Sequence, residues 1–151
     1  MARFHITKSH YELLAAFRHA LRRFLGFSQS AARAAGLEAQ QHQALLAIKG
    51  FPRRDFVSVG ELAECLLLRH HSAVELVDRL VERKLLRRTP SEVDRRRVEV
   101  RLTARGESVI QRLAAAHVRE LRQLGPELHR LLGSIIEGID RPVRSKQQGE
   151  A

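Results

Sequence analysis

The sequence predicts a mainly α-helical protein with one small β-hairpin, and three observations support this fold class. Apolar residues recur at helical spacing in several segments before residue 84 and again after residue 103. Between residues 85 and 102 the period shortens to two, as in half-buried strands. The chain has 151 residues, 44% of them apolar, which is sufficient for one domain whose core, without Trp, should be aliphatic.

The first third of the chain predicts two helices. The first spans about residues 9–30, and its apolar residues recur at helical spacing: Leu14, Phe17, Leu21, Phe24 and Leu25. Gly36 interrupts this pattern, and a second helix is expected over residues 38–49. A glycine and a proline follow that helix and end it, so residues 51–56 are expected to form a loop.

Two shorter helices are predicted next, with a tight connection between them. Ser58 is placed to cap a helix over residues 59–67, because its hydroxyl can accept a bond from a first-turn N–H group. After a connection at residues 68–70, a helix over residues 71–83 carries a narrow apolar stripe. The stripe consists of Ala73, Leu76, Val77 and Leu80. The remaining face of this helix is polar.

The hairpin follows directly. Residues 85–89 and residues 97–102 are expected to be its strands, and residues 90–96 its polar tip. Five arginines lie within eleven residues of this segment: Arg87, Arg88, Arg95, Arg96 and Arg97. Two helices joined by a tight turn and followed by a basic hairpin predict a winged helix-turn-helix. In that fold the second helix enters the major groove of DNA and the wing reaches a neighbouring minor groove.

The C-terminal third is predicted to be helical. Thr103 is a suitable N-cap for a long helix, Gly125-Pro126 is expected to break it, and a last helix should follow. The first helix and these last two carry more apolar surface than a small winged helix needs. We therefore expect them to pack against a second copy in a homodimer. Residues 142–151 are expected to be a disordered tail.

Charge favours a polyanionic partner. The formal net charge is +10, and arginine supplies nearly all of the positive charge. Arginine binds phosphate and base edges through two parallel bonds, which solubility alone does not require. Double-stranded DNA is therefore the expected partner. No apolar run is long enough to span a bilayer, the N-terminus lacks the apolar core of a signal peptide, and the expected location is the cytoplasm.

Several segments, taken together, resemble the MarR family of bacterial transcription regulators. They are Gly36–His42, Val59–Glu64, Leu76–Arg83, Asp94–Arg97 and Leu102–Gly106. The resemblance covers residues from about 10 to 138, and its most specific part is the wing signature, an Asp-x-Arg followed by a strand that ends in Leu-Thr-x-x-Gly. It implies a DNA-binding lobe at about residues 37–102 and dimerisation helices at about residues 9–33 and 103–139, within a single domain over residues 1–141.

The resemblance also implies roles for individual residues. Asp94 would brace the wing and Arg96 would enter the minor groove. The full set expected to contact DNA is Arg69, His70, His71, Ser72, Glu75, Arg79, Arg95, Arg96 and Arg97. Ser72 can bond a phosphate or a base, and Glu75 can accept from a cytosine amine or remain a solvent-facing charge. One departure is Lys84, where the family usually has Gly at the end of the recognition helix.

The family resemblance further implies a palindromic DNA site, usually repression, and a small, often aromatic or phenolic ligand. We expect no catalytic residues, no cofactor and no metal site. An enzyme is disfavoured because the sequence has no glycine-rich phosphate loop, nucleophile elbow or His-Glu-x-x-His motif.

Two alternatives keep the same fold but replace the small ligand with a different signal, zinc or oxidation. In a zinc-responsive regulator, His19, His42 and His117 would meet near the ligand pocket, although their spacing lacks a metal-ligand pattern. In a thiol-based oxidation sensor, Cys65 would react. Its apolar neighbours instead predict a buried, inert thiol.

Overall fold

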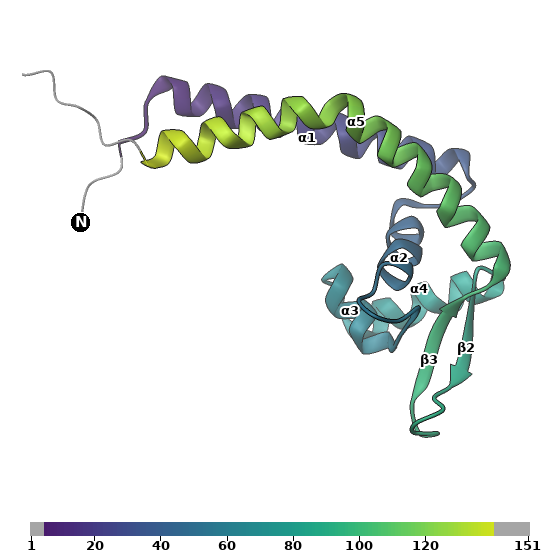
Figure 1. Cartoon of the computed structure of the whole chain (residues 1–151). Coiled ribbons are helices and arrows are strands. Elements are labelled where there is room, and N and C mark those ends of the chain that lie inside the picture. Colours follow the sequence, from purple (N-terminus) through teal and green to yellow (C-terminus); the bar gives the residue numbers. More distant parts are fainter. Residues whose placement is uncertain (1–4, 141–151) are drawn as a thin grey trace, which may run out of the picture. The chain divides into compact units, whose positions relative to one another are not determined.

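The computed structural model describes residues 5–140, which form five helices and a small sheet (Figure 1). In chain order the elements are α1 (Lys8–Ala34), α2 (Ala39–Lys49), β1 (Phe56–Val57), α3 (Val59–Leu66), α4 (His70–Glu82), β2 (Leu86–Pro90), β3 (Val98–Leu102) and α5 (Ala104–Asp140). The expected tail, residues 142–151, lies outside the described residues. No helix in the described part is long and apolar enough to cross a membrane.

The chain forms two compact units. One unit contains residues 27–118, and the other contains, of the described residues, 5–26 and 119–140. In the second unit the N-terminal part of α1 lies beside the C-terminal part of α5 (Figure 1). Ala20, Leu124 and Leu131 are buried there, and Arg23 Nη1 lies 3.3 Å from Glu127 Oε2.

The core of the other unit is aliphatic, as predicted. It is built from buried Ala, Leu, Ile and Val side chains of α2, α3, α4, the sheet and the first turns of α5. The largest of its fully buried side chains are Leu45, Ile48, Leu62, Leu80, Leu85 and Leu86. This core holds α3 and α4 against the strands, so the polar face of α4 and the hairpin are displayed by one packed body.

The sheet has three strands in the order β1-β3-β2, with both pairs antiparallel. The hairpin of β2 and β3 was predicted. The prediction that the loop continues to residue 56 was wrong, because Phe56 and Val57 form a strand that pairs with Arg101 and Val100. A strand of two residues is too short to show alternation. Its partner lies more than forty residues away in the sequence.

The predicted break at Gly125-Pro126 was also wrong, because α5 continues through Pro126 to Asp140. Proline removes one backbone hydrogen bond and crowds the preceding turn, which usually ends or kinks a helix. Here Leu124 and Leu131, on either side of the proline, are 5% and 2% exposed. Burial of these side chains within their unit stabilises the helical path on both sides of the missing bond.

Two helix ends use non-glycine residues in left-handed conformation. Lys84 has φ +58° and Leu67 has φ +54°. After α4, the N–H of Lys84 bonds the carbonyl of Val81 (2.9 Å) and the N–H of Leu85 bonds that of Leu80 (2.9 Å). This pair of bonds is the Schellman motif, in which glycine is the usual left-handed residue. Lys84 therefore ends α4 in the left-handed conformation expected of a glycine at this position. This conformation is energetically unfavourable for a residue with a side chain.

We expect Lys84→Gly to be neutral or to raise the free energy of unfolding by up to about 1 kcal/mol. Glycine removes the cost of a left-handed side-chain-bearing residue, about 1–2 kcal/mol, and returns part of it as added entropy of the unfolded chain. Thermal unfolding measures the change, with Glu82→Gly, inside the last turn of α4, as a control that should destabilise. A clear loss of stability in Lys84→Gly contradicts the prediction.

Candidate nucleic-acid interface

Helix α3 begins at a complete capping box. The Oγ of Ser58 accepts from the N–H of Glu61 (3.1 Å), and the N–H of Ser58 donates to Glu61 Oε2 (2.8 Å). The predicted cap at Ser58 is therefore confirmed. Burial disfavours the Glu61 carboxylate, but the bonds from Ser58 and Arg54 outweigh burial and lower the pKa of Glu61 below its ordinary value. The start of the helix-turn-helix is thus held by a charged, fully bonded carboxylate.

Helix α4 separates its faces as the sequence predicted. Ala73, Leu76, Val77 and Leu80 are buried. On its polar side the expected DNA-contacting residues are all exposed except Ser72, which is half-buried; the exposed ones are Arg69, His70, His71, Glu75 and Arg79. Arg69 is the N-cap residue of α4, and its side chain accepts no hydrogen bond from the first-turn N–H groups of that helix. Such N–H groups favour an approaching phosphate.

The wing tip is held by a small set of hydrogen bonds around Asp94. Its Oδ1 accepts from the N–H of Arg96 (3.1 Å), and its carbonyl accepts from the N–H of Arg97 (2.9 Å). The Oγ of Ser91 accepts weakly from the N–H groups of Val93 and Asp94, each at 3.3 Å. These bonds shape the tip while leaving arginine side chains in solvent: Arg95, Arg96 and Arg97 are all exposed.

Ion pairs and hydrogen bonds connect α4 to its neighbours. Arg88 of β2 pairs with Asp78 of α4, so the wing and α4 are joined directly. Just after α4, Arg83 Nη1 donates to Gln41 Oε1 (2.8 Å), and its Nη2 donates to the Gly36 carbonyl (2.6 Å). None of these links was predicted from the sequence. Only the Asp78–Arg88 pair joins opposite charges, and residue types do not specify which partners ten or more positions apart will meet.

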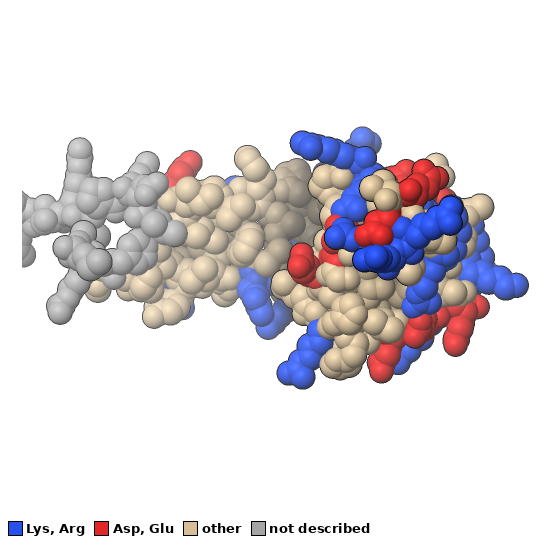
Figure 2. Space-filling view, turned by 90° about the horizontal axis from the view of Figure 1, so that it is seen from below, with Lys and Arg blue, Asp and Glu red and all other residues tan. Residues whose placement is uncertain are grey.

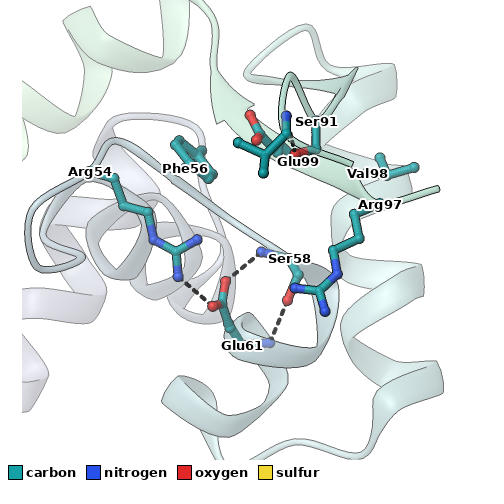
Figure 3. A pocket seen from close by; sticks show the side chains of 9 residues that line it. Arg54, Phe56, Ser58, Glu61, Ser91, Arg97, Val98 and Glu99 are labelled. Atoms are coloured by element: carbon teal, nitrogen blue, oxygen red, sulfur yellow. Dashed lines mark hydrogen bonds and ion pairs between the residues drawn. The ribbon is translucent and has the colours of Figure 1, made fainter. Parts of the chain in front are cut away.

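A cavity of about 230 Å³ lies between the wing and the start of α3 (Figure 3). Arg54, Ser58 and Glu61 line one side of it, and Glu99 and Arg97 of the hairpin line the other. Beside the cavity, the guanidinium carbons of Arg54 and Arg101 lie 4.9 Å and 4.3 Å from the centre of the Phe56 ring. Arg54 also pairs with Glu61, and Arg101 with Glu99 (2.7 Å). This arrangement ties β1, α3 and β3 together at the base of the wing.

Charged side chains are concentrated on the face of the lobe that carries the wing. Seen from below, lysine and arginine side chains project from it with acidic groups between them (Figure 2). Several of the acidic groups are already paired, including Asp78 with Arg88 and Glu61 with Arg54. Within residues 5–140, the side chains of the exposed wing-tip arginines form one ion pair, a long one between Arg97 Nε and Asp94 Oδ2 at 4.0 Å. The face therefore presents net positive charge.

The expectation that Cys65 is buried was wrong, because the thiol is exposed. Helix α3 packs through the side that carries Leu62 and Ala63, and Cys65 lies outside that side. The apolar neighbours in the sequence do not reveal this, because α3 buries only one face. Because the Cys65 thiol is exposed, burial cannot make it inert.

Of the three histidines considered for zinc, two are in contact within one unit: the ring centroids of His42 and His117 lie 4.7 Å apart. His19 is exposed on α1, in the other unit. Within residues 5–140 no group of three or more His, Cys, Asp or Glu residues is arranged to hold a metal ion.

Comparisons with known proteins agree with this architecture. Residues 35–97 match the MarR family model, which confirms the resemblance seen in the sequence. The fold is similar to that of AbsC, a MarR family transcriptional regulator from Streptomyces coelicolor (18% identity, 90% of this chain and 93% of that one, TM-score 0.70). No curated protein matches the sequence at a significant level.

Two similar structures contain DNA. One is a mutant of Escherichia coli MarR complexed with operator DNA (19% identity, 86% of this chain and 94% of that one, TM-score 0.64). The other is a mutant of Staphylococcus aureus MepR bound to an oligodeoxyribonucleotide (15% identity, 90% and 100%, TM-score 0.65). The predicted fold class, mainly helical with a winged helix-turn-helix, is confirmed.

Proposed function

From a winged lobe that matches the MarR family, we propose that this protein is a transcription regulator that binds a palindromic operator in double-stranded DNA as a homodimer. It acts in the cytoplasm, as a ligand-responsive repressor rather than an enzyme. One observation carries the proposal: the exposed polar face of α4 and the exposed arginines of the wing belong to one packed unit. The direct bond between Asp78 and Arg88 joins them.

The two elements suit different grooves. The start of α4 offers His71, Ser72 and Glu75, whose donors and acceptors match base edges in the major groove. The wing offers Arg96 beside Arg95 and Arg97, and arginine is favoured in the narrow, strongly negative minor groove. Asp94 accepts a hydrogen bond from the N–H of Arg96 at the tip from which they extend, and this bond supports a bracing role for Asp94.

Dimerisation is supported by apolar surface that the single chain leaves exposed. Tyr11 (63%), Leu14 (50%) and Leu25 (53%) are exposed on α1, and Leu121, Leu132 and Ile136 on α5. Two helices alone cannot cover both of their apolar sides, so a second copy is the natural partner. Leu131 of α5 is only 2% exposed and packs within its own unit, whereas Leu14 of α1 remains available to a second copy.

A ligand site is supported by a groove between α2 and α5. Its volume is about 420 Å³, and Leu46, Ile110 and Ala114 provide an apolar lining. Lys49 stands at its edge, paired with Glu107 at 3.0 Å. An apolar groove with one ion pair at its edge suits a small aromatic or phenolic ligand.

The test is selection of bound sequences from random duplex DNA, with and without aromatic acids, combined with sedimentation. We expect a palindromic consensus and a stable dimer at micromolar concentration. Failure to enrich any sequence, or a stable monomer, contradicts the proposal.

Ser72→Ala should change which half-site is preferred, by about 1–3 kcal/mol if a direct base contact is lost. It should leave the salt dependence of binding nearly unchanged, because no charge is removed. Titration of the variant against the selected duplex and single-base variants measures the effect. A uniform loss of affinity for every sequence would move the base-reading role to His70, His71 or Glu75.

A further inference from the structure

Two histidines from different helices are stacked inside the larger unit. His42 of α2 is only 4% exposed, and its ring lies against that of His117 of α5, with an interplanar angle of 36°. Phe27 of α1 contacts His117 edge-on, with centroids 5.4 Å apart. All three residues belong to the unit of residues 27–118. Three helices therefore meet around one imidazole pair that the DNA-reading face does not use.

Hydrogen bonds define the state of His117. Its Nδ1 lies 2.7 Å from the Leu113 carbonyl, and its Nε2 lies 2.8 Å from the Oγ of Ser28. A carbonyl only accepts, so Nδ1 carries the proton. In the neutral ring Nε2 is then an acceptor and the Ser28 hydroxyl donates to it. This ring is thus bonded on both sides, to α5 itself and to α1.

The surroundings of His42 disfavour a charged ring. Burial lowers the pKa of His42 below 6.5, and the nearby His117 lowers it further. From α1, the residues at the pair are Phe27 and Ser28, which carry no charge. From the end of α4, the charged guanidinium of Arg83 is bonded to Gln41, the residue before His42. These contacts favour the neutral form of His42 in the packed arrangement.

The pair is linked to the recognition helix through the next residue in the chain. Gln41 Oε1 accepts from the N–H of Glu38 (3.0 Å) and from Arg83 Nη1 (2.8 Å). Arg83 also holds the Gly36 carbonyl at the turn before α2 (2.6 Å). A shift of α2 away from α5 therefore pulls on the residue that ends α4.

We propose that the His42–His117 pair is a proton-sensitive contact that sets the position of α2 and, through Gln41 and Arg83, that of the recognition helix. Acidification opens the pair and lowers DNA affinity. This regulation rests on the proposed DNA-binding function, but the coupling itself is a property of the free protein and can be measured without DNA.

The direction follows from proton linkage. A hydrated His42, in an opened or unfolded chain, takes up a proton near pH 6.5, whereas the packed ring does so only at lower pH. The packed arrangement is therefore fully stable above about pH 6.5 and loses stability as the pH falls from there towards the lowered pKa. Uptake of a single proton limits the loss of affinity to about tenfold per pH unit.

The first experiment follows the histidine ring protons of the full-length wild-type protein by NMR across a pH titration without DNA. We expect His42 to titrate below pH 6.5, and the Gly36 amide and Arg83 side-chain signals to shift with the same midpoint. If His42 titrates at or above that value, or if Gly36 and Arg83 do not follow it, the inference is wrong. This readout also stands if a variant fails to fold.

The second experiment compares DNA affinity between about pH 7 and about pH 5.5 for the wild type, His42→Gln and His19→Gln. Glutamine does not titrate, so His42→Gln should lose a several-fold acid sensitivity that the wild type shows. His19 is exposed on α1, so His19→Gln is the matched control and should behave as the wild type. Any effect of pH on the DNA-contacting residues themselves is common to all three proteins, so their comparison cancels it.

The outcomes separate the two hypotheses. Equal pH profiles for His42→Gln and the wild type overturn the inference while leaving DNA binding intact. If no protein binds any duplex at any pH, the proposed function fails. The NMR titration then decides the coupling alone: common movement of His42, Gly36 and Arg83 supports it, and independent movement overturns it.

Discussion

Gly106→Ala is expected to destabilise the winged lobe by about 3 kcal/mol or more, above the usual range for overpacking. A methyl group on Gly106 would lie 2.2 Å from the carbonyl oxygen of Leu85. This oxygen belongs to the backbone, so it cannot move aside by a side-chain rotation. The same carbonyl accepts from the N–H of Thr103 (3.0 Å). Relief of the clash must therefore move the start of α5 away from the strand that opens the wing.

Thermal and denaturant unfolding measure this effect, and a fall in the midpoint of roughly 6–12 °C is expected for a chain of this size. Gly133→Ala is the matched control, since an added Cβ there meets no atom within 4 Å. In mid-helix it should stabilise by about 0.5–1 kcal/mol. Equal stability of Gly106→Ala and the wild type would show that α5 does not approach Leu85 this closely.

Arg96→Ala is expected to weaken binding to many DNA sequences alike, by about tenfold for each wing of the dimer at 0.1 M salt. Arg96 is exposed on the wing tip, and the minor groove it should enter distinguishes little more than A·T from G·C pairs. Loss of one phosphate-equivalent contact from each wing should lower the slope of log K against log salt concentration by about 0.9 per wing, or about 1.8 for the dimer. The specificity set by α4 should remain.

Titrations of specific and scrambled duplexes at several salt concentrations test this. Arg130→Ala, which removes one exposed arginine from the other unit, is the control for net charge. Its slope should equal that of the wild type. If Arg96→Ala binds as tightly as the wild type at every salt concentration, the wing does not contact DNA.

Local chemistry explains what could be predicted. The Ser58 cap and the Thr103 cap both act within one turn of their helix: Thr103 Oγ1 accepts from the N–H of Gly106 (3.1 Å). The alternation before Thr103 is likewise a property of one segment, so it identified the strand β3. Asp94 bonds a backbone group two residues away. Each of these signals is contained in a few consecutive residues.

The errors concern residues whose state depends on distant parts of the chain. Phe56 and Val57 become a strand because β3 pairs with them. Pro126 remains inside α5 because flanking leucines are buried within their unit. Cys65 is exposed because α3 packs through its other side. None of these outcomes is visible in the spacing or type of the neighbouring residues.

The sequence by itself determined the class of fold, the order of its helices and hairpin, the basic wing and the resemblance to a regulator family. These properties follow from periodicity, capping residues and charge, which act over one or two turns of chain. Only the tertiary structure decided that His42 meets His117, that Arg83 joins α4 to Gln41 and that Asp78 joins α4 to the wing. Such contacts depend on which faces pack together, because packing brings side chains tens of residues apart within bonding distance.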